Sequence, residues 1–277
     1  MSDKEGQIEL FDINKNVDLI DEVKTLAPWM GGKHLLSKEI GRIIRSTEHQ
    51  AYCEPFVGMG GVFFKKRQIV RCEVINDRND EIINLFKVVR DRPEELKKQF
   101  KYALSSRSEF YRLKSLDFNS LKDVEKAARF LYLQRLRFGG SATSCVYGVD
   151  NLHGSRLNVD KLFSRIDSVY NRLKVVNIEN LDFEGFISRY DGKHVLFYCD
   201  PPYYKCSGYK IKFKEEDHTR LNKCLSNIRG KFILSINDHE YIRELFNKHY
   251  IKEVSTSYSI RGKRIKGNEL IISNYKI

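Results

Sequence analysis

The segment Asp200–Tyr203 reads Asp-Pro-Pro-Tyr and directly follows an apolar run, Val195–Cys199. Such a run predicts a central buried strand, and ligands of open α/β sheets bind beyond the carboxyl ends of these strands. An amino group on an aromatic ring is a poor nucleophile because its lone pair is delocalised into the ring. A carboxylate and a backbone carbonyl that both accept from this group favour the tetrahedral nitrogen needed for attack, and the segment offers both acceptors.

Each residue of this segment has a part in that chemistry. Asp200 supplies the carboxylate and Pro201 the carbonyl, while the rings of Pro201 and Pro202 restrict the backbone so that both acceptors stay aimed. Tyr203 offers a flat face on which a flipped base can stack. A plain strand-to-turn junction is the alternative, because Asp-Pro often begins a turn. We interpret the segment as a catalytic centre that acts on the amino group of a planar base.

A glycine-rich turn follows another predicted strand, Ala51–Phe56. Gly58 and Gly60 let the chain turn sharply, with its backbone amides facing a ligand. A dinucleotide fingerprint would need glycine where Phe63 stands, so the pattern argues against a nicotinamide cofactor. Asp77 ends the next predicted strand, where an acid typically binds ribose hydroxyls. The turn and this acid together predict a nucleoside-containing cofactor.

The only tryptophan, Trp29, lies beside two glycines and Lys33. The glycines allow close approach of a ligand, and the Lys33 ammonium suits a carboxylate such as that of a methionine-like moiety. An ordinary capped loop before a helix is the alternative.

Alternating strands and helices predict a parallel sheet that is covered on both faces. The glycine-rich turn is expected to continue as a helix through Arg67. A helix in the middle of the chain is expected to be capped at Ser120–Asp123 and to end at Gly139-Gly140. Further helices are predicted at 80–90 and 215–228, strands at 71–76 and 232–236, and a terminal hairpin at 255–260 and 270–275.

The chain is expected to divide into four parts. Residues 1–24 form an acidic extension with three lysines and seven acids, and residues 25–88 form the cofactor-binding part. A mainly helical insertion follows over residues 89–170. Residues 171–277 complete the catalytic domain with the Asp-Pro-Pro-Tyr segment and the hairpin.

Composition favours a polyanionic partner and a cytoplasmic location. The formal net charge is +12, and there is no apolar run long enough to span a membrane. The six cysteines include no Cys-x-x-Cys pair, so neither a zinc site nor a disulfide framework is expected. We expect no metal, no membrane contact and a monomer or weak dimer.

In order and spacing, these segments resemble the Dam family of N6-adenine DNA methyltransferases. The family's W-x-G-G-K stands here at Trp29–Lys33, its E-P-F-x-G-x-G at Glu54–Gly60 and its N-D-x-N at Asn76–Asn79, ahead of the complete D-P-P-Y. The likeness runs from about residue 27 to residue 276. It implies a Rossmann-like, S-adenosylmethionine-dependent methyltransferase sheet with an inserted target-recognition domain.

The resemblance also implies how S-adenosylmethionine binds. Trp29 and Lys33 would contact its amino-acid end and Asp77 its ribose. Asp182 would accept from the adenine amino group, although a surface turn explains that residue about as well. The residues expected at the cofactor are Trp29, Lys33, Phe56, Gly58, Gly60, Asp77, Asp182, Phe183 and Asp200.

Two basic elements are predicted to contact double-stranded DNA. Arg135 and Arg137 lie in a segment that resembles the family's DNA-reading helix, with solvated helix charges as the alternative. The best-known members of the family carry N-R-x-x-x-N-G here, followed by R-Y-N and F-N-V-P. This chain has Gln134-Arg135 and then Phe138-Gly139-Gly140, with no clear R-Y-N or F-N-V-P, so GATC specificity does not follow. The predicted hairpin turn carries four cations suited to phosphate contacts: Arg261, Lys263, Arg264 and Lys266.

These features predict a site-specific DNA adenine methyltransferase that flips its target base and transfers the methyl group directly, in line. Methylation of adenine in RNA is one alternative, because related motifs serve such substrates. A DNA-binding protein with a degenerate cofactor pocket is another, and the intact Asp-Pro-Pro-Tyr segment argues against it.

Overall fold

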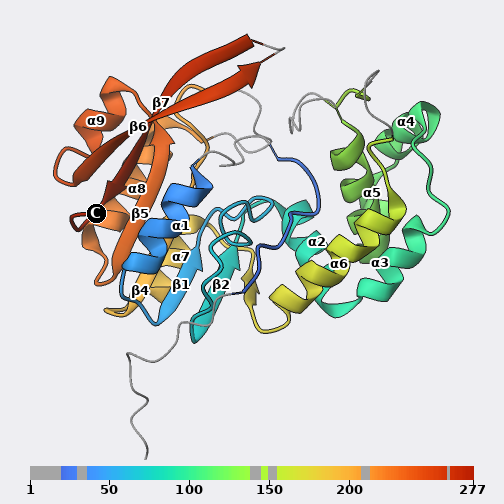
Figure 1. Cartoon of the computed structure of the whole chain (residues 1–277), viewed down its shortest axis with the longest axis horizontal. Coiled ribbons are helices and arrows are strands. Elements are labelled where there is room, and N and C mark those ends of the chain that lie inside the picture. The colour runs from blue at the N-terminus through green and yellow to red at the C-terminus, as the bar shows by residue number, and fades with distance from the viewer. Residues whose placement is uncertain (1–19, 30–35, 138–144, 149–154, 207–212, 261–262) are drawn as a thin grey trace, which may run out of the picture.

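The computed structural model describes residues 20–29, 36–137, 145–148, 155–206, 213–260 and 263–277. Its centre is a seven-stranded sheet with the order β3-β2-β1-β4-β5-β7-β6 (Figure 1). The first five strands in this order are parallel, and β7 is antiparallel to both of its neighbours. The strands are β1 (Ala51–Glu54), β2 (Cys72–Asn76), β3 (Asn177–Glu179), β4 (Val195–Cys199), β5 (Lys231–Asn237), β6 (Tyr250–Ile260) and β7 (Lys263–Ser273).

The strand order reverses beside β1. The chain runs outward from β1 to β2 and β3, and then returns to place β4 on the other side of β1. The carboxyl ends of β1 and β4 are therefore neighbours at a topological switch point, where open α/β sheets bind ligands. This topology, together with the antiparallel hairpin at the edge, confirms the expected Rossmann-like α/β fold.

Two buried clusters cover the two faces of the sheet because side chains alternate along each strand. Tyr52 belongs to one cluster and Cys53 to the other. The first face packs against α1 (Ser37–Ser46) and α2 (Asp80–Asp91). The second packs against α7 (Phe183–Tyr190), α8 (Glu215–Asn227) and α9 (Glu240–Leu245). β4 is buried along its whole length, as its apolar run predicts.

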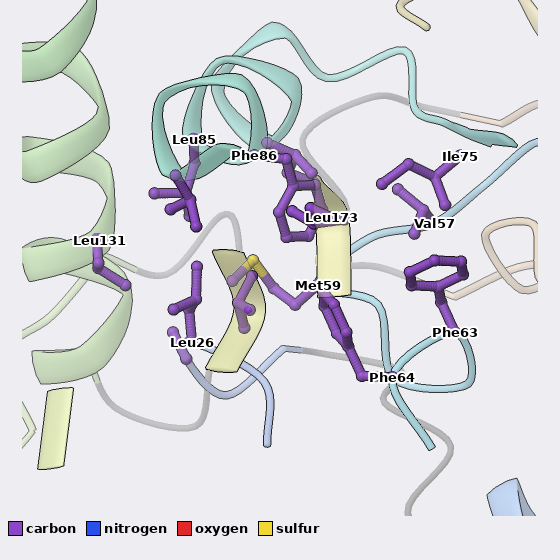
Figure 2. Packing of buried hydrophobic residues seen from close by; sticks show 14 of the residues in the cluster. Leu26, Val57, Met59, Phe63, Phe64, Ile75, Leu85, Phe86, Leu131 and Leu173 are labelled. Carbon is purple, nitrogen blue, oxygen red and sulfur yellow. The ribbon is translucent and has the colours of Figure 1, made fainter. Parts of the chain in front are cut away.

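The remaining helices gather on one side of the sheet, next to α2 (Figure 1). Both α5 and α6 pack against α2, so the helical region shares a core with the cofactor half. Figure 2 shows this shared core, in which side chains of the glycine-rich turn lie among those of the helices. These helices are α3 (Pro93–Phe100), α4 (Arg107–Ser115), α5 (Asp123–Leu136) and α6 (Val159–Leu173). The boundaries of an inserted domain stay a prediction.

Two local predictions were wrong. Residues 58–65 form successive turns in place of the helix expected through Arg67. Gly58 and Gly60 have positive φ angles of 50° and 74°, as expected for the predicted turn, and Arg67, where the helix was expected to end, has a positive φ of 62° that lies outside the right-handed helical region. The middle helix begins at Asp123, and Ser120 belongs to a preceding 3₁₀ turn.

No helix in the described part of the chain is long and apolar enough to cross a membrane. All six cysteines are free thiols.

Candidate active site at the switch point

Asp200 lies at the carboxyl end of β4, one residue beyond the fully buried strand. The Ser235 hydroxyl on β5 donates to Asp200 Oδ1 over 3.3 Å and lies 2.8 Å from the hydroxyl of Tyr198. Pro201, next along the chain, is buried. Because β4 and β5 are hydrogen-bonded neighbours, this chain of hydroxyls holds the Asp200 carboxylate at the edge of the sheet.

Glu54 places a second buried carboxyl at the adjacent carboxyl end of β1. The Tyr52 hydroxyl donates to Glu54 Oε1 over 2.6 Å. Burial raises the pKa of Glu54 to about 8, and the nearby charge of Asp200 acts in the same direction. Glu54 therefore keeps its proton beside Asp200, and the charge of Asp200 favours a positively charged group at this edge of the sheet.

Three predicted cofactor segments meet beside these acids. The backbone amide of Gly58 donates to Asp77 Oδ2 over 2.9 Å, and that of Asn79 donates to Oδ1 over 2.8 Å. Burial raises the pKa of Asp77 to about 6, against the opposing effect of these two hydrogen bonds. A methyl group in place of the Gly58 hydrogen would lie 3.0 Å from the indole nitrogen of Trp29, so the tryptophan rests directly on the turn.

Asn76 connects the loops after three strands and was missed from the sequence. Its amide nitrogen donates to the carbonyls of Pro55 and Leu181 over 2.9 and 3.1 Å. Its amide oxygen accepts from the Leu181 N–H over 2.7 Å. An asparagine at the end of a buried strand was the available signal, because a buried amide must find partners. These bonds fix Asp77 and Asp182 relative to each other.

Asp182 caps α7 and keeps one oxygen for another donor. Its Oδ1 accepts from the Glu184 N–H over 3.1 Å and from Arg220 over 2.8 Å. Its Oδ2 lies 3.8 Å from the guanidinium of Arg78 and accepts no hydrogen bond within the described residues. The carboxylate is thus oriented by α7 and α8 while Oδ2 remains available as an acceptor.

An aromatic wall lies between the glycine-rich turn and Asp182. The ring centroids of Phe56, Phe183 and Phe213 are 5.5 to 5.7 Å apart. The guanidinium of Arg220 lies over the Phe183 ring at 4.8 Å. Flat apolar faces next to Asp77 and Asp182 suit a nucleoside, and the buried acids suit a cationic group. The described residues therefore fit S-adenosylmethionine.

The two tyrosines after the prolines are held from β5 and β7. The Tyr203 hydroxyl donates to Glu269 Oε2 over 2.5 Å. The amide of Asn237 binds the backbone of Tyr204 twice, accepting from its N–H over 2.9 Å and donating to its carbonyl over 3.2 Å. Sequence reasoning missed Asn237 and Glu269 because both are far from the segment along the chain.

Arg135 and Arg137 are buried, which does not match the expectation of exposed DNA contacts. Arg135 donates to the carbonyls of Leu26 and Arg156 over 2.6 and 3.2 Å. Its neighbour Gln134 donates to the Pro28 carbonyl over 2.7 Å. The physical reason is packing, because α5 lies against the segment that leads to Trp29. The side chains of Gln134 and Arg135 donate hydrogen bonds to the backbone carbonyls of that segment.

The other basic residues that the sequence predicted to contact the cofactor or DNA cannot be placed in the same way. Lys33 and Arg261 lie outside the described residues, as do the side chains of Lys263, Arg264 and Lys266. The backbone of the last three belongs to β7, in the part of the hairpin that pairs only with β6. Their contact with phosphate stays a prediction.

Known proteins resemble this chain over almost its whole length. Residues 29–260 match the family model for D12 class N6 adenine-specific DNA methyltransferases. The Type II methyltransferase M1.LlaDCHI of Lactococcus lactis subsp. cremoris is 29% identical, with 91% of this chain and 96% of the relative covered. The Type II methyltransferase M.CviBI of Paramecium bursaria Chlorella virus NC1A is 25% identical, with coverage of 91% and 100%.

Among solved structures, a putative RNA methyltransferase from Pyrococcus horikoshii is a distant likeness, with a TM-score of 0.44 and 6% identity over 91% of both chains. The family model itself spans far more than half of the sequence. The chain therefore belongs to the family of D12 class N6 adenine-specific DNA methyltransferases, and the reaction of this family is methylation of adenine in DNA.

Proposed function

We propose that the chain methylates a flipped adenine of duplex DNA at N6 by direct, in-line transfer, with Asp200–Tyr203 as its catalytic centre. The observation that carries this proposal is the Asp200 carboxylate, which Ser235 holds at the switch point beside the buried Glu54. Membership of a methyltransferase family implies S-adenosylmethionine as the donor. When bound, it supplies a methyl group carried on a sulfonium sulphur.

The catalytic segment acts on the amino group of the base. Asp200 Oδ accepts one N–H and the Pro201 carbonyl accepts the other, which draws the nitrogen lone pair out of the ring. The Tyr203 ring stacks on the base and fixes its plane. The Asp200 carboxylate also stands where it can take the proton that leaves the nitrogen.

The cofactor is held by the surrounding segments. Asp77 binds the ribose hydroxyls, and Asp182 Oδ2 accepts from the adenine amino group next to the Phe183 amide. The Asp200 carboxylate, next to the buried and protonated Glu54, favours a cationic donor over its neutral product. The other proposed contacts are Trp29, Lys33, Phe56, Gly58 and Gly60.

We place the duplex against the projecting β6–β7 hairpin. The net charge of +12 supports a polyanionic partner, and the hairpin carries four cations, Arg261 between its strands and Lys263, Arg264 and Lys266 in β7, although the sequence predicted all four in the turn. The buried placement of Arg135 and Arg137 favours a structural role for these two. By analogy with relatives named Type II methyltransferases, the enzyme protects host DNA within a restriction–modification pair. It acts in the cytoplasm as a monomer or weak dimer.

Expression in a host that lacks DNA methylation tests this proposal. Sequencing that detects N6-methyladenine should find one short motif modified throughout the genome. Asp200→Ala should abolish the modification, whereas Asp160→Asn, an exposed acid on α6, should leave it intact. A wild-type rate for Asp200→Ala would remove Asp200 from the catalytic centre. Tritium transfer from labelled cofactor to RNA in preference to DNA would overturn the choice of duplex DNA.

A further inference from the structure

The β6–β7 hairpin projects from the edge of the sheet (Figure 1). The strand pairing places Glu269 where this hairpin joins the sheet. It is the first residue of β7 that pairs with β5, opposite Asn237, and it also pairs with Val254 on β6. The β7 residues before it pair with β6 alone. The carbonyl of the preceding Asn268 accepts from the Asp238 N–H, just beyond β5, over 3.1 Å. A displacement of the hairpin therefore reaches the sheet at Asn268 and Glu269.

The side chain of Glu269 points to the catalytic segment and not to solvent. Only 3% of the residue is exposed, and its Oε2 accepts the Tyr203 hydroxyl over 2.5 Å. A hydroxyl that donates to a carboxylate forms a charge-assisted bond, which is stronger than a bond between neutral groups. Burial raises the pKa of Tyr203 far above its usual range, with the charges of Asp200 and Glu269 acting in the same direction, so the hydroxyl keeps its proton and donates.

The neighbouring Tyr204 is held by residues other than Glu269. Asn237 binds both backbone groups of Tyr204. The Tyr204 ring stacks on Tyr241 at a centroid distance of 4.7 Å and meets His239 edge-on at 4.6 Å. Its backbone and ring are thus fixed from β5 and α9, whereas the bond to Glu269 restrains the Tyr203 ring from β7.

We propose that Glu269 is a positioning residue that sets the orientation of the Tyr203 ring for stacking on the target base and links the DNA-facing hairpin to the catalytic segment. The inference rests on the proposed stacking role of Tyr203. If the Tyr203 ring could rotate freely, its rotational freedom would be lost each time a base is bound. The hydrogen bond to Glu269 fixes the ring before the base arrives. The tether acts on the base and not on the cofactor, so its loss should slow transfer without weakening cofactor binding.

A double-mutant cycle tests this inference. Tyr203→Phe keeps the ring but removes the donor, and Glu269→Leu removes the acceptor at similar volume. Each should lower the single-turnover methylation rate at saturating DNA by about tenfold, the factor that corresponds to ordering one side chain. The rate of the double variant should also be about tenfold below that of wild type, and not about a hundredfold below it, because the two changes break the same hydrogen bond. Glu269→Gln retains an acceptor oxygen and should recover most of the rate.

Cofactor affinity and thermal unfolding are measured on the same variants. The Kd of S-adenosylhomocysteine should stay within about twofold of wild type, which a general structural defect would not allow. Multiplicative losses, or a wild-type rate for Tyr203→Phe, would overturn the positioning role. If Glu269→Leu fails to fold, Glu269→Ala, which also removes the acceptor, takes its place in the cycle. A wild-type enzyme that does not methylate DNA would instead contradict the proposed function, so the two failures are distinguishable.

Discussion

Individual buried acids set the electrostatics of this site. Asp77 and Glu54 both have a pKa above the ordinary value, and in both cases burial is the main cause. The two differ in their partners: two backbone amides bind Asp77, whereas a tyrosine hydroxyl binds Glu54. Asp77 therefore ionises near neutral pH and can accept from a ligand, while Glu54 holds its proton up to about pH 8.

Asp77 should make cofactor affinity depend on pH. Its carboxyl group ionises as the pH rises through about 6, and the ionised form accepts more strongly from ribose hydroxyls. The Kd for S-adenosylhomocysteine, measured by calorimetry, should therefore rise about tenfold as the pH falls from roughly 7.5 to 5. Asp77→Asn should bind weakly at all pH values and lose most of this dependence. An unchanged pH profile in that variant would assign the titration to another group.

Glu54 should lower stability as the pH rises. The folded protein keeps a proton on Glu54 up to about pH 8, whereas the unfolded chain releases it near the ordinary value of 4.5. Between these values the folded state binds more protons, so the free energy of unfolding falls with pH, by at most about 1.4 kcal/mol per unit. Glu54→Gln removes this loss. Urea unfolding at three pH values should show Glu54→Gln gaining on wild type toward alkaline pH, and a constant difference would contradict it.

At the level of elements, one buried ion cluster ties the helical region to the sheet. Glu73 on β2 lies 2.5 Å from Lys66, which follows the glycine-rich turn, and 2.5 Å from Arg172 on α6. The three residues are at most 4% exposed. The Lys66 ammonium also lies over the Tyr52 ring at 4.6 Å. The turn, the strand and the helix are therefore held together at one point.

Removal of the central acid should be severely destabilising. Glu73→Gln leaves two buried cations without a counter-charge, and the loss of one partner from a buried ion pair costs roughly 3–5 kcal/mol. Glu94→Gln is the matched control, because Glu94 pairs with Lys97 over 2.9 Å with its side chain 74% exposed. That change should cost less than about 1 kcal/mol. Similar losses for both variants in denaturant unfolding would contradict this account of the cluster.

At the scale of the whole molecule, two features favour DNA as a partner. The protein has a positive net charge, and its β6–β7 hairpin projects from the edge of the sheet (Figure 1). The proposed catalytic residues lie where β1, β4 and β5 end, and β7 leads from that edge into the hairpin. DNA held on the hairpin would thus lie next to the catalytic segment.

The hairpin should contribute most of the salt dependence of DNA binding. Replacement of its four cations (Arg261, Lys263, Arg264 and Lys266) with alanine should make the plot of log K against log salt less steep, by up to about 0.9 for each lost phosphate contact. The loss should be similar for specific and nonspecific duplexes. A slope equal to that of wild type would exclude these residues from the DNA contact.

The sequence alone was sufficient to predict methyl transfer to adenine, because the motifs that indicate this reaction consist of residues that are adjacent in the chain. Asp-Pro-Pro-Tyr after a buried strand, glycines at a turn and Asp77 at the end of the next strand are local patterns, and each implies a local geometry. The same holds for the alternation of strands and helices and for the terminal hairpin. The helix expected after the glycine-rich turn was wrong because the turns continue through residue 65, and the positive φ angle of Arg67 depends on how this segment packs.

Only the tertiary structure decided which distant residues serve these segments. The register of β7 against β5 brings Glu269 to Tyr203, 66 residues away along the chain. The packing of α5 against the segment before Trp29 turns Arg135 inward, although its charge alone suggested a DNA contact. Both outcomes depend on strand register and helix packing, which arise from many weak contacts between remote parts of the chain. A short sequence pattern contains no record of those contacts.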